Sequence, residues 1–469
     1  MAEKFIKPGP VGWMIGVSAL ILFGCSSLRH ILFQSTAYDL GIFDQAIYLI
    51  SQGQSPISSF IGFHILGDHA AWIYYFLALF YKIHPSVYWL FGVQAVALAV
   101  GAVPVWHLSR HAGLTIQLSV AMAAVYLLYP LVYNINLFDF HPDTIAVPAL
   151  IWAVLSARRD RPRWFCLSIF LVLACKAVIS LTVVALGVWL LIFEKKRLCG
   201  TIALISGIAW FIIATKIVIP FFGGDSASVE RHLGRYSYLG NSFSEIFHNV
   251  LFHPVNILGI LLSKLFSSDN LFYLVLLLIP VIWGLSLKSL APLLGALPCL
   301  AINLLADYPM QKDLIHQYSI PAIPFLFVVA IDTLAAGRGW PRTKRGIIIW
   351  SLVAFLALAK FGYFSSIYLS SLDNWQATQD AIAQVQTKDS VYTTAQIAPH
   401  LSQRKLISLT SANSPPVDLN TFHYVLLNTR HPGWSSTQEF ATNLLNQLKN
   451  QPGFNLNYQR DDVYLFVKK

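Results

Sequence analysis

Carboxylate side chains suited to acid–base chemistry gather in a polar segment near the N-terminus, residues 34–86. Asp39, Asp44 and Asp68 all fall within it, the first two in the string YDLGIFDQ (residues 38–45). Asp39 follows an apolar run by only a few residues, where a carboxylate is costly unless it is hydrogen-bonded, paired with a cation or used in catalysis. This placement indicates a catalytic site. The alternative for Asp39 is a helix N-cap, since a second apolar run follows it.

A second acidic cluster stands in the string NLFDFHPD (residues 136–143), a short turn between two apolar runs. Asp139 and His141 offer the oxygen and nitrogen ligands that bind a divalent cation such as Mg²⁺ or Mn²⁺. Such a cation is the one cofactor that the sequence suggests. The alternative is a capped helix start, with Asp143 near the N-terminus of the next helix.

Three basic residues are candidates for binding a phosphate. Lys176 interrupts an apolar run, where a lysine is either a fixed charge for an anion or a side chain that extends to the membrane surface. Arg231 and Arg235 stand four residues apart and can reach one phosphate together if the segment is helical. Contact with lipid headgroups is the alternative for these two arginines.

Further hydrogen-bonding side chains lie near the ends of apolar runs, and we predict that they bind substrate: His69, His316 and Tyr318. Tyrosines at such positions also form the aromatic belt at a membrane surface, which is the alternative for Tyr318.

The composition is that of a membrane protein. Of 469 residues, 56% are hydrophobic and only 12% are charged, whereas soluble domains are about 45–50% apolar and about 25% charged. This excludes a soluble enzyme and a disordered chain. The five cysteines contain no CxxC pair, so neither a disulfide framework nor a cysteine metal site is indicated.

Runs of about 20 apolar residues can cross a bilayer as helices, because a helix satisfies its own backbone hydrogen bonds in lipid. The sequence predicts eleven spans, with one long apolar stretch divided at residues 176–180. The polar segment 34–86 lies between the first two spans and is here called the first outer loop. Within it, residues 39–51 have the apolar spacing of an amphipathic helix lying on the membrane. The predicted spans are 11–33, 87–107, 115–136, 144–157, 164–180, 181–193, 198–220, 271–287, 290–306, 318–336 and 347–370.

Charge predicts the orientation. Residues 1–370 contain 24 Lys and Arg, and 15 of these precede the first span or follow an even-numbered one. Since cytoplasmic loops are rich in Lys and Arg, we predict a cytoplasmic N-terminus. Eleven of the 15 acidic residues in the same region fall on the opposite side, which indicates an outward-facing site. The net charge of +10 therefore reflects topology, and no nucleic-acid partner is expected.

The tail, residues 371–469, is polar. Its β-rich runs are 391–394, 424–428 and 462–467, and they alternate with amphipathic stretches at 395–402 and 436–450. This alternation predicts a small α/β domain outside the membrane. The predicted fold is therefore an all-α polytopic membrane protein over residues 1–370, followed by a small C-terminal α/β extracytoplasmic domain over residues 371–469.

These strings together resemble a bacterial family of membrane proteins, the domain of unknown function two thousand and seventy-nine. The resemblance spans most of the chain. It is carried, in order, by YDLGIFDQ (38–45), DH (68–69), NLFDFHP (136–142), RYSYLG (235–240), HQY (316–318) and APHLSQR (398–404).

That family is grouped by fold with the GT-C glycosyltransferases, multispan enzymes that use polyprenyl-phosphate sugars and carry an acidic residue in the first outer loop. The resemblance implies a GT-C-like fold and a role for Asp39. One feature departs from the family, which usually has one or two acids directly after the lysine matching Lys176; here Ala177 and Val178 follow. If those acids serve catalysis or hold a metal, this protein is altered or inactive. If they only neutralise the lysine, Lys176 is freer to meet an anion.

The implied function is transfer of a sugar from a polyprenyl-phosphate donor to an acceptor at the outer face of the bacterial plasma (inner) membrane. We expect Asp39 to be the general base, with Asp44 or Asp68 substituting for it or orienting it. The expected partners are the lipid-linked donor and membrane lipids. The rivals are a transporter or flippase, which ionisable residues concentrated near the span ends disfavour, and a non-catalytic assembly protein that works through its tail. Asp332 and Lys360 are the main exceptions to that concentration.

Overall fold

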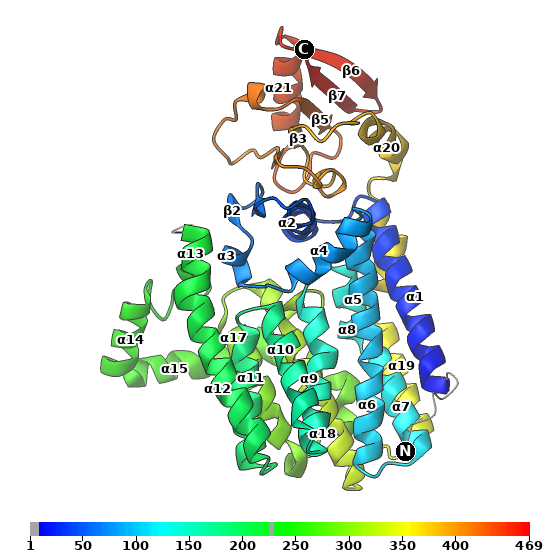
Figure 1. Cartoon of the computed structure of the whole chain (residues 1–469), viewed down its shortest axis with the longest axis vertical. Coiled ribbons are helices and arrows are strands. Elements are labelled where there is room, and N and C mark those ends of the chain that lie inside the picture. The colour runs from blue at the N-terminus through cyan, green and yellow to red at the C-terminus, as the bar shows by residue number, and fades with distance from the viewer. Residues whose placement is uncertain (1–8, 225–228) are drawn as a thin grey trace. The chain divides into compact units, whose positions relative to one another are not determined.

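Two compact units make up the protein, seen in a computed structural model (Figure 1). The structure describes residues 9–224 and 229–469, and the side chains of all of these except residues 229–232 and 243. The first unit, here called the helical unit, comprises Met1–Phe23, Leu66–Ile73 and Gly92–Lys360. The second, the sheet unit, comprises Gly24–Ile65, Tyr74–Phe91 and Phe361–Lys469.

Apolar α-helices form most of the helical unit, and two of them, α1 and α5, also contain residues of the sheet unit. The α-helices are α1 (Pro10–Ile31), α3 (Leu66–His69), α5 (Tyr88–Val100), α6 (Ala102–His111), α7 (Ile116–Leu127), α8 (Pro130–Leu137), α9 (Asp143–Arg158), α10 (Pro162–Cys175), α11 (Ile179–Ile192), α12 (Arg197–Ile213), α13 (Ile219–Gly223), α14 (Phe243–Phe252), α15 (Pro254–Leu265), α16 (Ser268–Leu278), α17 (Leu297–Leu305), α18 (Ile323–Ala335) and α19 (Lys344–Leu358). A π-helix, η2 (Ala214–Val218), and short 3-10 helices connect them: η4 (Val229–Tyr236), η5 (Ile279–Gly284), η6 (Leu287–Ser289), η7 (Ala291–Ala296), η8 (Pro309–Lys312) and η9 (Gln317–Ala322).

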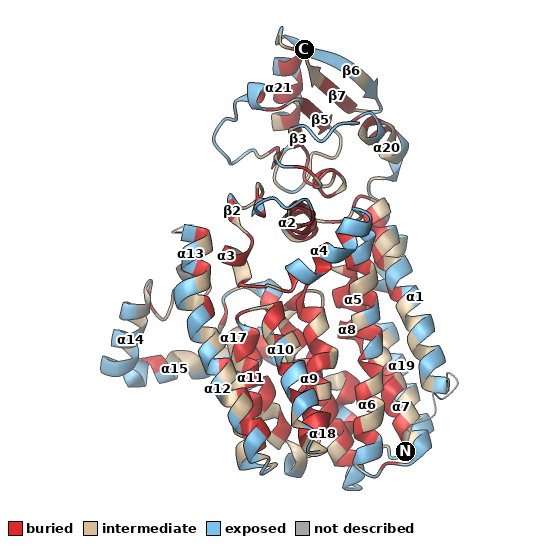
Figure 2. Cartoon of the chain, in the orientation of Figure 1, coloured by how far each residue is buried: buried red, intermediate tan, exposed pale blue. Residues whose placement is uncertain are grey.

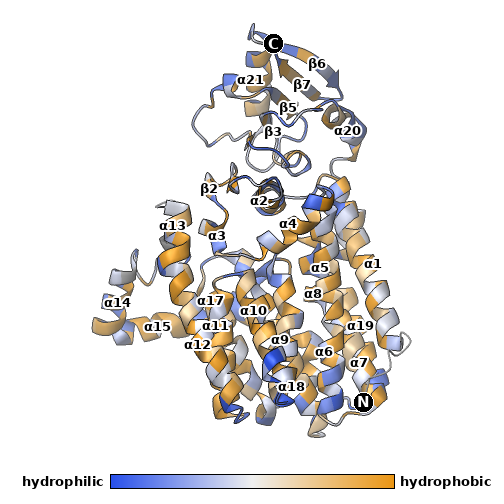
Figure 3. Cartoon of the chain, in the orientation of Figure 1, coloured by the Kyte–Doolittle hydropathy of each residue, from blue (hydrophilic) through white to orange (hydrophobic). Residues whose placement is uncertain are grey.

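Helices that follow one another in the chain pack side by side, α9 with α10 and α11 with α12 (Figure 1). α9 and α18 are buried along most of their length, whereas α12 has an exposed apolar face that includes Ile205 and Ile212 (Figure 2). Apolar residues dominate both the buried and the exposed faces of these helices (Figure 3). An apolar face of this length suits contact with lipid.

Helical structure is present at each of the eleven predicted spans. Within the described residues, six stretches are long and apolar enough to cross a membrane: Pro10–Ile31, Tyr88–His111, Ile116–Leu137, Arg197–Gly223, Pro309–Ala335 and Lys344–Leu369. Other apolar helices are shorter: Pro162–Cys175, Ile179–Ile192, Ser268–Gly284 and Ala291–Leu305. The chain is therefore a mostly helical protein with several membrane-spanning helices, and the exact number of crossings stays a prediction.

One apolar element was not predicted. α14 and α15 are bent by 104° where His253 meets Pro254, and together they are apolar enough to count as one broken span. Proline ends the first helix because the residue before it is disfavoured in the helical conformation. Polar residues such as Glu245 and Asn249 interrupt the apolar run, so the sequence showed no continuous span here.

The C-terminal part of the sheet unit contains a five-stranded sheet of order β4-β3-β5-β7-β6. β3 pairs in parallel with β4 and β5, and β7 pairs antiparallel with β5 and β6. The strands and flanking helices are β3 (Val391–Thr393), β4 (Ile407–Leu409), β5 (Tyr424–Asn428), β6 (Phe454–Arg460), β7 (Val463–Lys468), α20 (Trp375–Ala383) and α21 (Gln438–Lys449).

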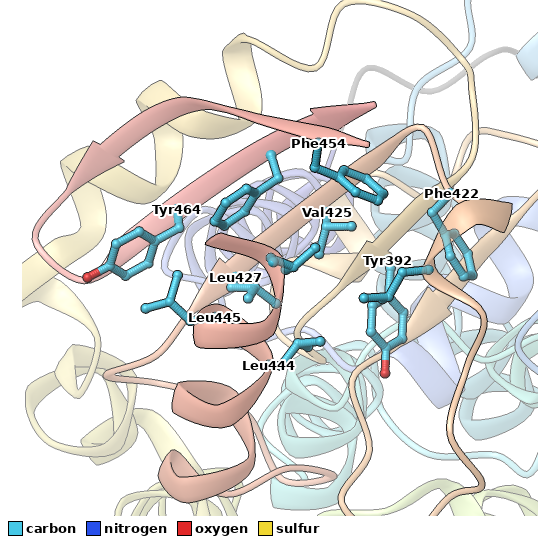
Figure 4. Close-up of a cluster of buried hydrophobic side chains, with 11 residues drawn as sticks. Tyr392, Phe422, Val425, Leu427, Leu444, Leu445, Phe454 and Tyr464 are labelled. Atoms are coloured by element: carbon cyan, nitrogen blue, oxygen red, sulfur yellow. The ribbon is translucent and has the colours of Figure 1, made fainter. Parts of the chain in front are cut away.

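α21 closes the core of this sheet. Leu444, Leu445 and Leu448 lie on one face of the helix and pack against Val425 and Leu427 of β5 (Figure 4). Their spacing of one, three and four residues is that of a helix with a single apolar face. The amphipathic pattern at 436–450 therefore identified this helix.

The structure agrees with the predicted strand positions at 391–394, 424–428 and 462–467, which coincide with β3, β5 and β7. The amphipathic stretch predicted at 395–402 is wrong as a helix, because the structure has only a 3-10 turn there, η13 (Ala398–His400). Pro399 lacks a backbone donor and suits the start of such a turn. β4 and β6 escaped prediction, since β4 has three residues and β6 alternates with Asn and Gln.

Much of the first outer loop belongs to the sheet unit, contrary to the predicted boundary at residue 371. This part of the loop holds the π-helix η1 (Ala37–Gly41), α2 (Ile42–Ser51), α4 (Tyr74–Ile83) and a small hairpin of β1 (Ile57–Ser58) and β2 (Phe63–His64). The fully buried Gln45 joins it to the tail: its amide nitrogen donates to the Arg404 carbonyl (3.1 Å) and its amide oxygen accepts from Ser58 (2.8 Å). α2 is buried on nearly all sides within its own unit, so the prediction of a helix at 39–51 lying on the membrane is wrong in its location.

A buried ion-pair network joins three elements of the helical unit. Arg158, in the last turn of α9, donates to both carboxylate oxygens of Asp332 (2.8 and 2.7 Å) and to both of Glu194 (3.1 and 2.8 Å). The guanidinium fork matches a carboxylate in this two-bond geometry. These contacts explain why an aspartate is tolerated within the apolar α18.

Replacing Arg158 with Met should therefore lower the free energy of unfolding by about 1–3 kcal/mol, because two partly buried carboxylates lose their partner. The measurement is the melting temperature of the purified protein in detergent. Arg159→Met, the neighbouring residue, is the matched control. Equal melting temperatures for the two variants would contradict the role assigned to this network.

Candidate functional site

The break between α10 and α11 places a lysine inside the helical unit. α10 ends just before Lys176, whose backbone is extended with φ −167° and ψ 138°. The segment that includes α3 fills this break, because the Ala177 amide donates to the His69 carbonyl (2.9 Å) and the Ile73 amide donates to the Ala174 carbonyl (3.1 Å). The backbone groups that the break frees are thus satisfied, and residues 66–73 lie beside Lys176.

Lys176 forms an ion pair with Asp143, the first residue of α9. Its Nζ lies 3.2 Å from the Asp143 Oδ2, and the two side chains are 12% and 4% exposed. The membrane-surface alternative for Lys176 is therefore wrong. Of the two alternatives for Ala177 and Val178, the one that leaves Lys176 freer to meet an anion is disfavoured, since Asp143 of another helix pairs with it.

A pocket with an empty volume of about 460 Å³ adjoins this pair, and its lining includes Thr182, Asn303, Gln317 and Tyr318. Among the described residues, Asp143 Oδ1 and Gln317 Oε1 are buried and have no hydrogen-bond partner. A buried acceptor without a partner costs about 1–3 kcal/mol. A ligand that supplies donors here would therefore be stabilised.

Arg235 supplies a second cation in the helical unit. Its guanidinium lies over the rings of Tyr308 (4.4 Å) and Tyr318 (5.6 Å), and it donates to the Gln311 amide oxygen (3.1 Å). No acidic side chain in the described ranges forms an ion pair with it. Arg235 is thus positioned next to Tyr318 with its charge not neutralised.

Of the two arginines predicted to bind one phosphate, the structure describes the side chain of Arg235 alone. Arg231 lies in the same 3-10 helix, η4, as Arg235, but its side chain is outside the described residues. A 3-10 helix aligns residues three apart. The prediction that Arg231 and Arg235 reach one phosphate together assumed an α-helix, in which residues four apart share a face. Arg231 as a phosphate ligand stays a prediction.

Two histidines of the helical unit each pair with a carboxylate. His69 Nε2 lies 3.2 Å from Asp68 Oδ2, and His316 Nδ1 lies 2.6 Å from Asp313 Oδ2. A carboxylate in this position orients the imidazole ring. Asp68 also interacts electrostatically with Lys176.

The ring of His316 contacts two aromatic side chains, Tyr318 and Phe138. The His316 ring lies 6.4 Å from the Tyr318 ring and meets the Phe138 ring edge-on at 4.1 Å. Phe138 in turn stacks on His141 at 5.6 Å. The helical unit therefore brings together most of the predicted site residues: Asp68, His69, Asp139, His141, Lys176, Arg235, His316 and Tyr318.

Asp139 and His141 are both buried in the turn before α9. Gln94 of α5 holds this turn, because its amide nitrogen donates to the Asp139 carbonyl (2.8 Å) and its amide oxygen accepts from the His141 amide (2.9 Å). Asp139 has a φ of 81°, which few residues other than glycine adopt. These contacts favour the helix-start alternative. In the parts of the chain that the structure describes, no three His, Cys, Asp or Glu side chains are grouped so as to hold a metal ion, and the divalent cation stays a prediction.

Asp39 belongs to the sheet unit and lies within η1, partly exposed. Its Oδ2 accepts a hydrogen bond from the Thr36 hydroxyl (3.0 Å). Thr36 holds the N-cap position of η1, so the N-cap alternative for Asp39 is wrong. A carboxylate in the first turn that bonds back to the cap residue still stabilises the helix start.

Asp44, also in the sheet unit, is 1% exposed and accepts three hydrogen bonds: from Tyr81 (2.5 Å), Ser402 (2.6 Å) and Gln403 (3.2 Å). Burial raises the pKa of the Asp44 carboxyl, and these hydrogen bonds partly oppose that effect. A general base needs an oxygen that the substrate proton can reach. The contacts therefore favour a structural role for Asp44 over the predicted catalytic one.

Residues 29–465 match the family model described as "Predicted membrane protein (DUF2079)". The chain belongs to this family. The match covers nearly the whole protein, and both units lie largely within it. A search of curated proteins finds no significant match.

Solved structures show the fold. This DUF2079 member resembles the crystal structure of ArnT from Cupriavidus metallidurans bound to undecaprenyl phosphate, with a TM-score of 0.54, 11% identity and 98% of each chain covered. The apo state of the same ArnT gives a TM-score of 0.53 at 10% identity, covering 97% of each chain. An oligosaccharyltransferase from Archaeoglobus fulgidus in its apo form gives 0.46 at 12% identity, covering 91% of this chain and 70% of that one. The structural neighbours are GT-C glycosyltransferases, and at these identities the ArnT structures establish a GT-C-like fold.

Two residues of the candidate site were missed as ligands. Asp143 ends the string at 136–143 and was considered only within that turn, as a carboxylate near a possible cation site or as a helix start, because nothing in its spacing pointed to a lysine 33 residues later. Gln317 stands inside the HQY string of the DUF2079 resemblance, between two residues that were predicted. Its position in that string was the available signal.

We expect Lys176→Met to destabilise the protein by about 3–5 kcal/mol, because Asp143 would remain buried without a counter-charge. Adding Asp143→Asn to this variant should recover most of the loss. The measurement is a double-mutant cycle of melting temperatures in detergent. A double variant no more stable than Lys176→Met alone would show that the ion pair is not what the first substitution removes.

Asp44→Ala should cost about 3 kcal/mol or more, since three donors lose their acceptor inside the sheet unit. Glu439→Gln, at an exposed position in the first turn of α21, should change stability by no more than about 0.5 kcal/mol. Thermal unfolding followed by intrinsic fluorescence measures both. Similar melting curves for the two variants would contradict the structural role of Asp44 and favour its predicted role as a catalytic base.

Proposed function

We propose that this protein is a membrane glycosyltransferase that transfers a sugar from a polyprenyl-phosphate donor to an acceptor at the outer face of the bacterial plasma membrane. The observation that carries the proposal is the pocket at the break between α10 and α11, which adjoins the buried pair of Lys176 and Asp143, and whose lining residue Tyr318 lies beneath the guanidinium of Arg235. The GT-C-like fold supports it, because one structure of that fold holds undecaprenyl phosphate. The one-sided basic residues support the orientation.

In the proposed reaction, a hydroxyl of the acceptor attacks the anomeric carbon of the donor sugar. The bond between that carbon and the phosphate oxygen breaks, and polyprenyl phosphate leaves with the electron pair. Arg235 stabilises the negative charge that develops on this phosphate, most strongly where water is excluded. Lys176, whose charge is already paired with Asp143, contributes a hydrogen bond to it. His69, His316 and Tyr318 supply further hydrogen bonds.

A carboxylate takes the proton of the attacking hydroxyl. Asp39 is the proposed base, because the family resemblance implies an acidic residue in the first outer loop and because Asp39 is partly exposed. Asp68 is the second candidate, because it lies with Lys176 in the helical unit. No step is assigned to a divalent cation at Asp139 and His141.

The test is incubation of the purified protein, reconstituted in liposomes, with labelled polyprenyl-phosphate sugars and envelope extract as the acceptor source. A transferase cleaves the sugar–phosphate bond, a flippase moves the donor across the bilayer without cleavage, and an assembly protein only binds it. EDTA treatment in the same assay tests the cation. Transbilayer movement or binding without any cleavage would overturn the proposal.

Asp39→Asn should lower turnover about 10²–10⁴-fold, the usual contribution of a general base, with an unchanged melting temperature. Arg235→Met should weaken donor binding about tenfold or more, since a charged hydrogen bond is lost. Arg345→Met, an exposed basic residue of the predicted cytoplasmic side, is the control for loss of charge alone. Normal turnover in Asp39→Asn together with a large loss in Asp68→Asn would move the base to Asp68, and normal turnover in both would remove the assignment.

A further inference from the structure

A second pocket, with an empty volume of about 840 Å³, lies within the sheet unit. Five separated stretches of the chain line it, and two strings of the family resemblance meet there. Residues 38–45 contribute Asp44, and residues 398–404 contribute five residues of the lining: Pro399, His400, Leu401, Gln403 and Arg404. None of the residues that surround Lys176 takes part.

Arg404 brings a buried positive charge to this pocket. The residue is 2% exposed; its Nε donates to the Leu401 carbonyl (2.5 Å) and its Nη1 to the Asp389 carbonyl (2.6 Å). Backbone carbonyls satisfy these donors but carry no net charge, and no carboxylate of the described residues forms an ion pair with the guanidinium. A buried charge without a counter-charge is costly, and burial lowers the pKa of Arg404 to about 10.

Lys388 adds a second cation to the lining. Its side chain is exposed and its Nζ lies 5.6 Å from the centre of the Tyr48 ring. Across the described ranges it too has no ion-pair partner. The one acid in the lining, Asp44, already accepts three hydrogen bonds from other side chains.

His400 supplies a polar atom that is not yet used. Its ring stacks on His30 at 3.9 Å, and within the described residues its buried Nε2 has no hydrogen-bond partner. Burial lowers the pKa of His400 to about 4, so the imidazole is neutral at neutral pH. It can therefore donate or accept one hydrogen bond without adding charge.

We propose that this pocket of the sheet unit binds the phosphate group of an anionic ligand, with Arg404 and Lys388 as its charged contacts and His400 as a hydrogen-bond partner. Guanidinium and ammonium groups are the side chains that suit phosphate oxygens. The phosphate arrives either free or as a lipid headgroup, and both share this chemistry. The site is separate from the donor site of the proposed function and does not depend on it.

The test is isothermal titration of the full-length protein in detergent with inorganic phosphate and, separately, with dioctanoyl phosphatidic acid. Lys388→Met should weaken binding about tenfold or more, because an exposed charged contact is lost without disturbing the core. Lys405→Met, a nearby exposed lysine outside the lining, should leave binding within about twofold. Arg404→Lys keeps the charge but loses the fork, and it should also weaken binding.

Binding of either probe that depends on Lys388 supports the proposal and identifies the source of the phosphate. Absence of binding by both probes overturns it, as does an equal effect of Lys388→Met and Lys405→Met. The titration is repeated with Arg235→Met, which alters only the donor site. Loss of the Lys388-dependent binding in that variant would assign the phosphate to the donor site and overturn the second site, whereas its persistence would leave the second site standing even if no glycosyl transfer is found.

Discussion

A positive charge held away from water, at the break between α10 and α11, is the constraint on which the helical unit depends. Lys176 is tolerated there because Asp143 lies 3.2 Å away, which in turn requires α9 to begin beside the break. The break also frees backbone groups that lipid cannot satisfy, and residues 66–73 supply partners for them through His69 and Ile73. An ion pair and two backbone hydrogen bonds thus fix Lys176, the start of α9 and residues 66–73 in a single arrangement.

The sheet unit depends on a comparable constraint between distant parts of the chain. Asp44 and Gln45 stand in α2, yet their hydrogen-bond partners include Ser402 and the backbone of Arg404. These polar groups are fully buried, and each would be costly without its partner. Much of the first outer loop is therefore part of a folded core, in which two strings of the family resemblance, 38–45 from the loop and 398–404 from the tail, are in contact.

The sequence could predict the membrane class, the positions of helical spans and three of the strands, because each rests on a local pattern of apolar residues. It could not predict partners chosen by tertiary contact, such as Asp143 for Lys176 or Ser402 for Asp44, which are 33 and 358 residues apart. The error over α2 has the same origin, since an amphipathic helix shows one apolar face whether lipid or protein covers it. The candidate site was recognised mainly through the family strings, four of which lie in the helical unit, at residues 68–69, 136–142, 235–240 and 316–318, although nothing in their spacing required it.

The basic side chains differ in whether a carboxylate neutralises their charge. This difference separates those that stabilise the fold from those that can bind an anionic ligand. Arg158 and Lys176 are each neutralised by carboxylates from other helices, so their charges stabilise the fold before any ligand arrives. Arg235 and Arg404 are held instead by aromatic rings, an amide and carbonyls, which orient a guanidinium but leave its charge intact. A protein gains little from an unneutralised buried charge unless an anion completes it. Arg404 is such a buried charge in the sheet unit, and the partly buried Arg235 lies over Tyr318 of the pocket lining in the helical unit. The simplest account is that each unit binds its own anionic group, and a lipid-linked phosphate is one ligand of that kind.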